Sequence, residues 1–108
     1  MKDDKVYIEQ VLDAVRKIEE FTTGFDFVNF SADEKTQSAV ILQLAIIGEV
    51  AKKISEQEKS QIDLPWKEII GFRDRAIHDY FGIDIEIVWQ TIQVDIPELK
   101  MKLMKSAN

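Results

Sequence analysis

Apolar residues recur at steps of three and four over most of this chain, and that spacing is typical of helical folds. Between residues 4 and 22 they follow the 3.6-residue period of an α-helix. The chain also holds only four Gly and two Pro among 108 residues, too few for the many tight turns of an all-β fold. The sequence therefore predicts a single all-α domain over residues 1–108, large enough for one hydrophobic core. The periodic positions of the first segment are Ile8, Val11, Leu12, Val15, Ile18 and Phe21.

The first half of the chain predicts two helices joined by a loop. The first covers residues 4–22 and ends at Thr22-Thr23-Gly24. The aromatic segment FDFVNF at 25–30 is predicted to be a loop, because an isolated strand has no partner here. Ser31 to Glu34 has the S-x-x-E form of a capping box, so a second helix is expected from there to about Lys59.

The second predicted helix is apolar on nearly all sides. Val40, Leu44 and Ile47 form one stripe, while Leu42 and Ile46 lie off it. A helix of this kind is buried on more than one side. The pattern favours a homodimer in which a second subunit covers one of these sides. The alternative is that other helices of the same chain cover them all.

The second half predicts two more helices. Pro65 suits the first turn of a third helix, and Gly82 is a C-terminal stop. Asp84 caps a fourth helix, which Pro97 is expected to kink or restart before the segment 99–104. The short connections predict an up-and-down bundle of four to five helices.

Composition narrows the classes of function. The chain has no Cys, which excludes disulfides and thiolate metal sites and fits the cytoplasmic location that we expect. The N-terminal MKDDKVYIEQ lacks the apolar region of a signal peptide, and the longest apolar run, 39–47, is far short of the ~20 residues of a membrane span. The net charge of −6 argues against non-specific adhesion to nucleic acid. Any nucleic-acid site must depend on a local patch.

The stretch RDRAIHDY, residues 73–80, contains the only histidine of the chain. Arg, His and Tyr serve phosphate chemistry: Arg73 as a two-pronged donor, His78 as a proton carrier at neutral pH, and Tyr80 as a hydroxyl. On one regular helix Arg73 and His78 lie about 140° apart, so a two-fold axis that joins two copies would let both line one cleft. The simpler interpretation is a helix surface with ordinary ion pairs, such as Asp74 with His78 at i,i+4.

Two further side chains bear on this segment. Glu49 stands in the apolar stretch IIGEVAKK, and a buried carboxylate needs a partner. Arg73 is the first candidate, and the alternative is that Glu49 reaches solvent. Asp74 and His78 are too few ligands for a metal site, and no glycine-rich phosphate loop is present, so we expect neither metal nor cofactor. Trp66 and Trp89 are expected in the core.

The run LPWKEIIGFRDRAIHDYFGIDIEIVWQTI, residues 64–92, resembles the HepT-like branch of the HEPN superfamily. The R-x4-H-x-Y element of that family is met by Arg73, His78 and Tyr80, and the flanking P-W-x-x-I-x-G-F and F-G-I-D-x-x-x-V-W segments fit as well. The helix order and the AIIGE stretch at 45–49 extend the resemblance over nearly the whole chain.

The resemblance implies a homodimeric helical bundle that acts as the toxin of a toxin–antitoxin pair. It implies a metal-independent ribonuclease in which His78 is the general acid and base, Arg73 stabilises charge on the scissile phosphate, and the 2′-hydroxyl of RNA is the nucleophile. The implied antitoxin is a minimal nucleotidyltransferase (MntA-like) that transfers AMP onto Tyr80. The added phosphate and bulk would exclude RNA from the cleft.

One position departs from the pattern of the wider superfamily, where the residue after the arginine is often Asn and here is Asp74. Its charge would repel RNA phosphate and favour a more basic His78. The alternative function is a non-catalytic helical partner or substrate of a nucleotidyltransferase, and the plainest is a structural bundle without an active site. The basic residues available to hold RNA are Lys52, Lys53, Lys67, Arg73, Arg75, Lys100, Lys102 and Lys105.

Overall fold

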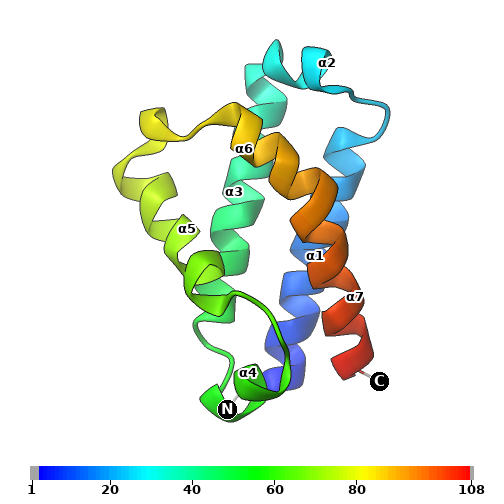
Figure 1. The fold of residues 1–108 in the computed structure, drawn as a ribbon, viewed down its shortest axis with the longest axis vertical. Helices are drawn as coiled ribbons and strands as arrows, with labels where there is room; N and C mark the ends of the chain where they lie inside the picture. The colour runs from blue at the N-terminus through cyan, green and yellow to red at the C-terminus, as the bar shows by residue number, and fades with distance from the viewer. Residues whose placement is uncertain (1–2, 108) are drawn as a thin grey trace.

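The computed structural model describes residues 3–107, and every regular element in that range is helical (Figure 1). The predicted all-α fold is therefore confirmed. The α-helices are α1 (Asp4–Thr22), α2 (Phe27–Ser31), α3 (Glu34–Ala51), α4 (Glu56–Gln61), α5 (Trp66–His78), α6 (Ile85–Gln90) and α7 (Ile96–Ala107). A 3₁₀ turn, η1 (Tyr80–Gly82), follows α5, and a π-helical turn, η2 (Thr91–Asp95), joins α6 to α7.

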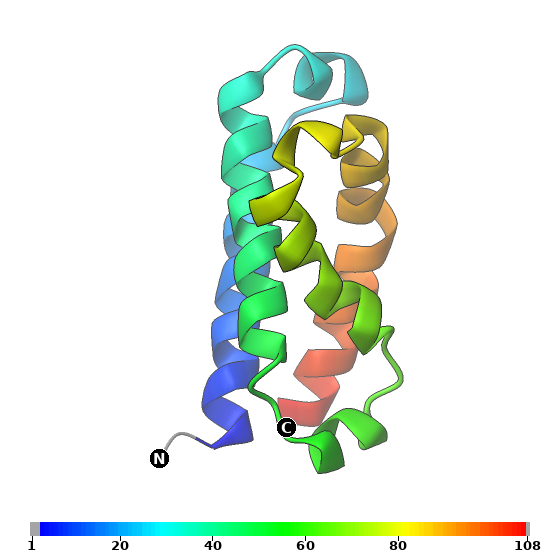
Figure 2. The ribbon, with the colours of Figure 1, turned by 90° about the vertical axis from the view of Figure 1, so that its left-hand side faces the viewer.

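Four long arms make up the bundle: α1, α3, α5 and the continuous unit of α6, η2 and α7. The central arm, α3, packs against α1 on one side and α5 on another, and α5 crosses it obliquely in Figure 2. This arrangement explains why α3 is apolar nearly all round, because helices of the same chain cover two of its sides. Leu42 is the exception and stays 58% exposed.

The core lies where α1, α3 and the α6–α7 arm meet. Its fully enclosed side chains include Ile18 of α1, Phe30 of α2 and Leu103 of α7, each with 0% of its surface exposed. At about 1.5–3 kcal/mol for each buried large apolar side chain, this burial is the main favourable contribution to folding. In contrast, α5 has no fully buried residue.

The segment 25–30, predicted to be a loop, is partly helical. Asp26 caps α2 by accepting a hydrogen bond from the backbone N–H of Asn29 (2.8 Å), and the Asn29 side chain accepts from the Asp26 N–H (3.1 Å). Phe30 packs on Trp89 with 5.2 Å between ring centroids, and Trp89, like Trp66, is partly buried against the core. The prediction was wrong because it considered a strand and overlooked the reciprocal cap.

Both ends predicted for the second long helix need correction. Asp33, not Ser31, caps α3, and its side chain accepts from the Thr36 N–H (3.0 Å). The helix ends at Ala51 instead of near Lys59, and Ser55 caps the separate helix α4. The Asp4 carboxylate accepts from the Ser55 N–H (2.8 Å) and hydroxyl (2.6 Å), so this new start is tied to the N-terminus of α1.

The end of α1 and the start of α6 agree with prediction. Gly24 adopts φ +80° just after α1, a left-handed conformation that suits glycine. The Asp84 side chain caps α6 by accepting from the Glu86 N–H (2.9 Å). The third helix, however, ends at His78 and not at Gly82.

The irregularity expected at Pro97 takes the form of a π turn directly before α7, and the chain remains helical through it. Pro97 has no N–H to donate to the carbonyl four residues earlier, and within the turn the Ile96 N–H donates to Thr91. A π turn of this kind absorbs the irregularity within a continuous helix. As a result α7 runs on to Ala107.

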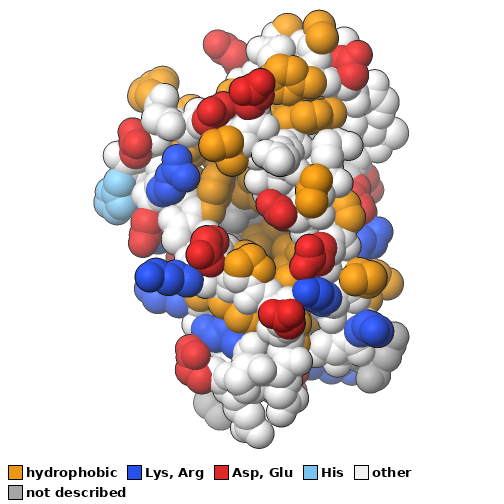
Figure 3. Space-filling view, viewed as in Figure 1, with side chains coloured by type: hydrophobic (Ala, Val, Ile, Leu, Met, Phe, Trp, Pro, Cys, Tyr) orange, Lys and Arg blue, Asp and Glu red, His pale blue; other side chains and the backbone are white. Residues whose placement is uncertain are grey.

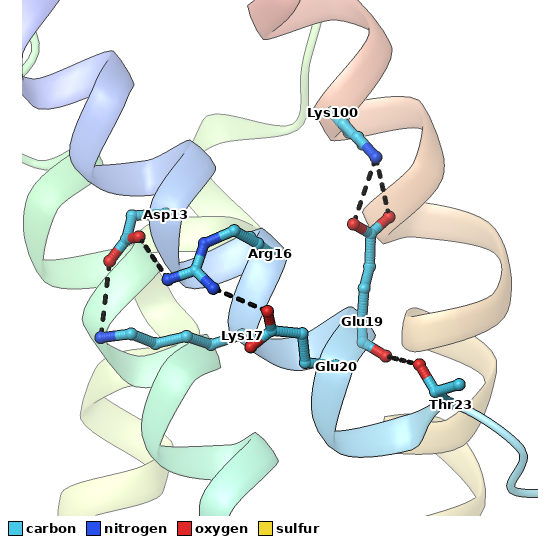
Figure 4. A network of polar contacts seen from close by, with 7 residues as sticks. All are labelled: Asp13, Arg16, Lys17, Glu19, Glu20, Thr23 and Lys100. Carbon is cyan, nitrogen blue, oxygen red and sulfur yellow. Dashed lines mark hydrogen bonds and ion pairs between the residues drawn. The ribbon is translucent and has the colours of Figure 1, made fainter.

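The outer surface of α1 carries ion pairs between its own side chains and one ion pair with α7 (Figure 4). Arg16 bridges Asp13 (2.9 Å) and Glu20 (2.8 Å), and Lys100 of α7 donates to Glu19 (3.1 and 3.2 Å). Exposed pairs of this type contribute about 0–1 kcal/mol each, so α7 is held mainly by apolar contacts. No helix within residues 3–107 combines the length and apolar character needed to cross a bilayer.

Candidate active site

Arg73, His78 and Tyr80 lie at the end of α5 and in the turn that follows it. Arg73 is inside the helix, His78 is its last residue, and Tyr80 begins η1. The sequence predicted a third helix that continues to Gly82 and so contains all three residues. In the structure Tyr80 lies beyond the end of the helix. Asp79, between helix and turn, has φ −147° and ψ 52°, which breaks the α-helical path and redirects the chain toward α3.

The guanidinium of Arg73 is held by two carboxylates. Its Nε forms an ion pair with Glu49 Oε2 of α3 (3.0 Å), and its Nη1 donates a hydrogen bond to Asp74 Oδ1 (3.3 Å). The structure thus confirms the expected pairing of Glu49 with Arg73, although Glu49 also reaches solvent, with 47% of its side chain exposed. Arginine has five N–H donors, and Nη2 makes no hydrogen bond or ion pair within residues 3–107. Nη2 of Arg73 is thus available to an anion.

His78 projects from the end of α5 and is exposed; Figure 3 shows it at the edge of the molecule. In the described part of the chain no hydrogen bond or ion pair joins it to Asp74, and none joins the side chains of Arg75 and Asp79. Asp74 instead contacts Arg73. The expected pairing of Asp74 with His78 is therefore wrong for this structure, and the imidazole is accessible to a ligand.

The Tyr80 hydroxyl lies 2.9 Å from the hydroxyl of Ser38 on α3. The Tyr80 ring also meets the ring of Phe81 edge to face, with centroids 5.6 Å apart. Phe81 itself is 99% exposed. Sequence analysis did not identify Ser38, because it stands 42 residues before Tyr80 and nothing in its local sequence marks it.

Gly48 allows α3 and α5 to approach closely beneath Arg73. A Cβ atom at this position would lie 2.7 Å from the Ile69 carbonyl oxygen and 3.1 Å from Arg73 Cβ. A carbon atom does not fit at such a distance, so only glycine at this position allows the observed short distance between α5 and α3. Glu49, the next residue, is thereby placed against Arg73.

Apolar side chains flank the Glu49–Arg73 pair. Leu42 lies seven residues, or about two turns, before Glu49 on the same stripe of α3, and Ile77 follows Arg73 by one turn on α5. Their side chains are 58% and 55% exposed. The site thus sits on a partly apolar face that α3 and α5 form together.

Basic residues do not gather around His78. Lys67 lies about 16 Å from His78 along α5 by helical rise, and Lys52 and Lys53 follow the opposite end of α3 from Ser38. Lys100 and Lys102 are paired with Glu19 and Glu98. Among the basic residues of α5, Arg75 and Arg73 are consequently the two nearest to His78.

A separate groove of about 410 Å³ lies between α5 and the α6–α7 arm, on the hollowed face in Figure 3. Its floor is apolar, with Leu44, Phe72 and Leu99, and its rim carries Glu68 and Asp95. Neither His78 nor Tyr80 lines it. The groove is therefore separate from these two residues, although Arg75 of α5 lines it.

Comparison with known proteins gives the family of this chain. Residues 11–106 match the family described as Ribonuclease HepT-like. The chain is 43% identical over 105 residues to a "Probable ribonuclease HepT" of Thermococcus cleftensis, covering 96% of both chains. It is 36% identical over 104 residues to a "Putative RNase" of Caldanaerobacter subterraneus subsp. tengcongensis, covering 95% of this chain and 93% of the relative.

The chain therefore belongs to the HepT-like family of the HEPN superfamily, as the motif and its flanks indicated. No solved structure gives a significant match.

Proposed function

We propose that this protein is a metal-independent endoribonuclease that cleaves RNA in a cleft between two copies of the chain. The observation that supports this most directly is that one helix carries both an anchored Arg73, whose Nη2 is available as a donor, and an accessible His78 five residues later. The chain also belongs to a family described as ribonuclease and has relatives with ribonuclease names, and both facts point to the same chemistry.

The residues suggest distinct roles in phosphodiester cleavage. With Nε held by Glu49, the Nη groups of Arg73 form the edge that would bind two phosphate oxygens and stabilise the charge that grows on them. His78 would take the proton of the RNA 2′-hydroxyl, whose oxygen attacks phosphorus. The 5′-oxygen then leaves and receives a proton from the imidazolium.

A homodimer brings the two roles together. Arg73 and His78 of one chain point about 140° apart on α5, and no hydrogen bond joins them in the described residues. The apolar flanks of the Glu49–Arg73 pair, Leu42 and Ile77, are exposed on the same two-helix face. Burial of that face against a second copy would remove them from water and place Arg73 and His78 of both chains along one cleft.

The same proposal makes the protein a cytoplasmic toxin that a nucleotidyltransferase antitoxin neutralises. The transfer would join the Tyr80 oxygen to the α-phosphorus of ATP, with pyrophosphate as the leaving group and the phenolic proton passing to a base. Tyr80 is 38% exposed and two residues from His78. An added phosphate there would repel the RNA phosphate from the cleft.

The decisive experiment is cleavage of total cellular RNA with EDTA present. Purified wild type, confirmed by intact mass to carry no AMP, is compared with His78→Ala and with Gln57→Ala, an exposed substitution on α4. We expect cleavage by the wild type and Gln57→Ala, and none by His78→Ala. Light scattering should show dimers for all three.

No cleavage by unmodified, dimeric wild type would refute the nuclease proposal. It would favour the alternative, a non-catalytic partner or substrate of a nucleotidyltransferase, for which Arg73 between two carboxylates would be an interface contact. Equal cleavage by wild type and His78→Ala would instead refute the role of His78.

A further inference from the structure

A cavity of about 290 Å³ lies directly against Tyr80, and we call it the Tyr80 cavity. Its walls come from the first turns of α3, the η1 turn and the start of α6, and include Ser38, Ile41, Tyr80, Ile83 and Ile85. Small-molecule pockets in proteins span ~300–1,000 Å³. The Tyr80 cavity is thus close to the smallest size that holds a compact ligand.

The hydroxyl of Tyr80 stands at the wall of this cavity. It lies 2.9 Å from the Ser38 hydroxyl, and both residues line the space. A group attached to the phenolic oxygen therefore begins beside the cavity. Once that oxygen is esterified it has no proton to donate, and the Ser38 hydroxyl becomes available as a donor to the attached group.

The remaining walls have the chemistry of a nucleoside site. Gln37 donates its amide nitrogen to the Phe30 carbonyl (2.7 Å), which leaves its amide oxygen as an acceptor. Glu34 adds a carboxylate, also an acceptor. The half-buried Ile83 and Ile85, with Ile41 behind them, line the space with apolar side chains against which a flat ring can lie. Acceptors and aliphatic walls suit a ligand that presents a planar base, an amino group and sugar hydroxyls.

The geometry points to a nucleoside-binding site: the Tyr80 cavity receives the adenosine of an adenylyl group esterified to Tyr80. This inference rests on the modification proposed above. The adenine ring lies on Ile41, Ile83 and Ile85, its amino group donates to the acceptors of the cavity, and Ser38 donates to the phosphate. The adduct is thereby held in one position, with its phosphate between α3 and the turn that follows His78.

The test uses protein in which the isoleucine methyl groups are labelled and Tyr80 is adenylylated by co-expression with a minimal nucleotidyltransferase. Intact mass and peptide mapping establish the adduct. We expect nuclear Overhauser contacts from the adenine protons to the methyl groups of Ile41, Ile83 and Ile85. The exposed Ile77 and Ile87 serve as internal controls and should show none.

A matched pair of variants tests the same point by chemistry. Ile83→Trp fills the cavity, whereas Ile87→Trp adds the same group to an exposed position on α6 (54% exposed). A phosphodiesterase should remove AMP from the Ile83→Trp adduct several-fold faster than from wild type or Ile87→Trp.

The outcomes separate this inference from the proposal beneath it. An adduct on Tyr80 whose adenine contacts none of the three cavity methyl groups overturns the site and leaves the modification intact. Failure to form any adduct, with an active nucleotidyltransferase, overturns both.

Discussion

Gly48 and Ile69 lie so close that a single methyl group would not fit between them. A Cβ atom at Gly48 would stand 2.7 Å from the Ile69 carbonyl oxygen. That oxygen belongs to the backbone of α5 and cannot move aside as the end of a flexible side chain could. Although α5 has no fully buried residue, its partly buried Ile69 and Phe72 pack against the core, and this close approach adds a backbone constraint on its position. It sets the distance at which Glu49 can reach Arg73.

Gly48→Ala should move α5 away from α3. We expect a loss of about 1–3 kcal/mol in the free energy of unfolding, as for an overpacked interface, measured by urea denaturation. RNA cleavage should fall as well, because the Glu49–Arg73 contact of 3.0 Å would lengthen.

Gly71→Ala is the matched control on α5 itself. A Cβ atom there meets nothing within 4 Å, and alanine favours a helix over glycine by up to ~1 kcal/mol. This variant should be equally or more stable and should cleave RNA normally. If Gly48→Ala behaved like Gly71→Ala, the close approach would have no part in positioning the site.

Asp74→Asn should raise RNA cleavage. The Asp74 carboxylate lies 3.3 Å from Arg73 Nη1, on the edge that a phosphate would occupy, so it competes with the substrate for those donors. Since Asp74 is 69% exposed, its removal should be worth at most ~1 kcal/mol, or roughly a fivefold gain in kcat/KM.

Asp63→Asn makes the same chemical change in the connector before α5 and controls for net charge. It should leave kcat/KM within error of wild type. A rise in both variants would indicate a general effect of charge, and a fall in Asp74→Asn would mean that Asp74 assists cleavage.

The sequence predicted those features of the fold that depend on local periodicity and local caps. The span of α1 and the Asp84 cap of α6 follow from residues within a few positions of each other. The break between α3 and α4 could not be predicted in this way, because Ser55 owes part of its role to Asp4, 51 residues away in the chain. Apolar periodicity continues across the break and hides it.

The candidate site shows the same division. The motif spacing identified Arg73, His78 and Tyr80 as candidates. Glu49 was found because a carboxylate in an apolar stretch requires a charged or hydrogen-bonding partner. The Ser38–Tyr80 contact and the close approach at Gly48 both depend on how α5 and η1 lie over α3. No pattern within α3 or α5 alone contains that information.

Ser38→Ala and Tyr80→Phe should have overlapping effects on stability. Each removes one partner of the 2.9 Å hydrogen bond, and each should cost about 0.5–1 kcal/mol, the low end for a hydrogen bond in view of its exposure. The double variant should cost less than the sum of the two. Exact additivity in urea denaturation would show that the bond does not contribute in solution.

The contact between Asp4 and Ser55 predicts how stability depends on acid. The Ser55 hydroxyl, and then its backbone N–H, donate to the Asp4 carboxylate and hold its pKa below the usual 3.8. In the unfolded chain the pKa returns to the usual value, so the native state favours the ionised form. The resulting stability is present above pH 3.8 and is lost as the pH falls through the lowered native pKa.

Asp4→Asn should therefore lose stability at neutral pH and show a shallower decline below pH 4 than wild type. Glu9→Gln, which alters an exposed carboxylate on the same helix, should keep the wild-type profile. Ser55→Ala should resemble Asp4→Asn in its pH dependence and lose a further ~1 kcal/mol at all pH values, because Ser55 also caps α4. Thermal unfolding from pH 2 to 7 measures all four proteins, and parallel profiles for wild type and Asp4→Asn would show that the contact does not link α1 to α4.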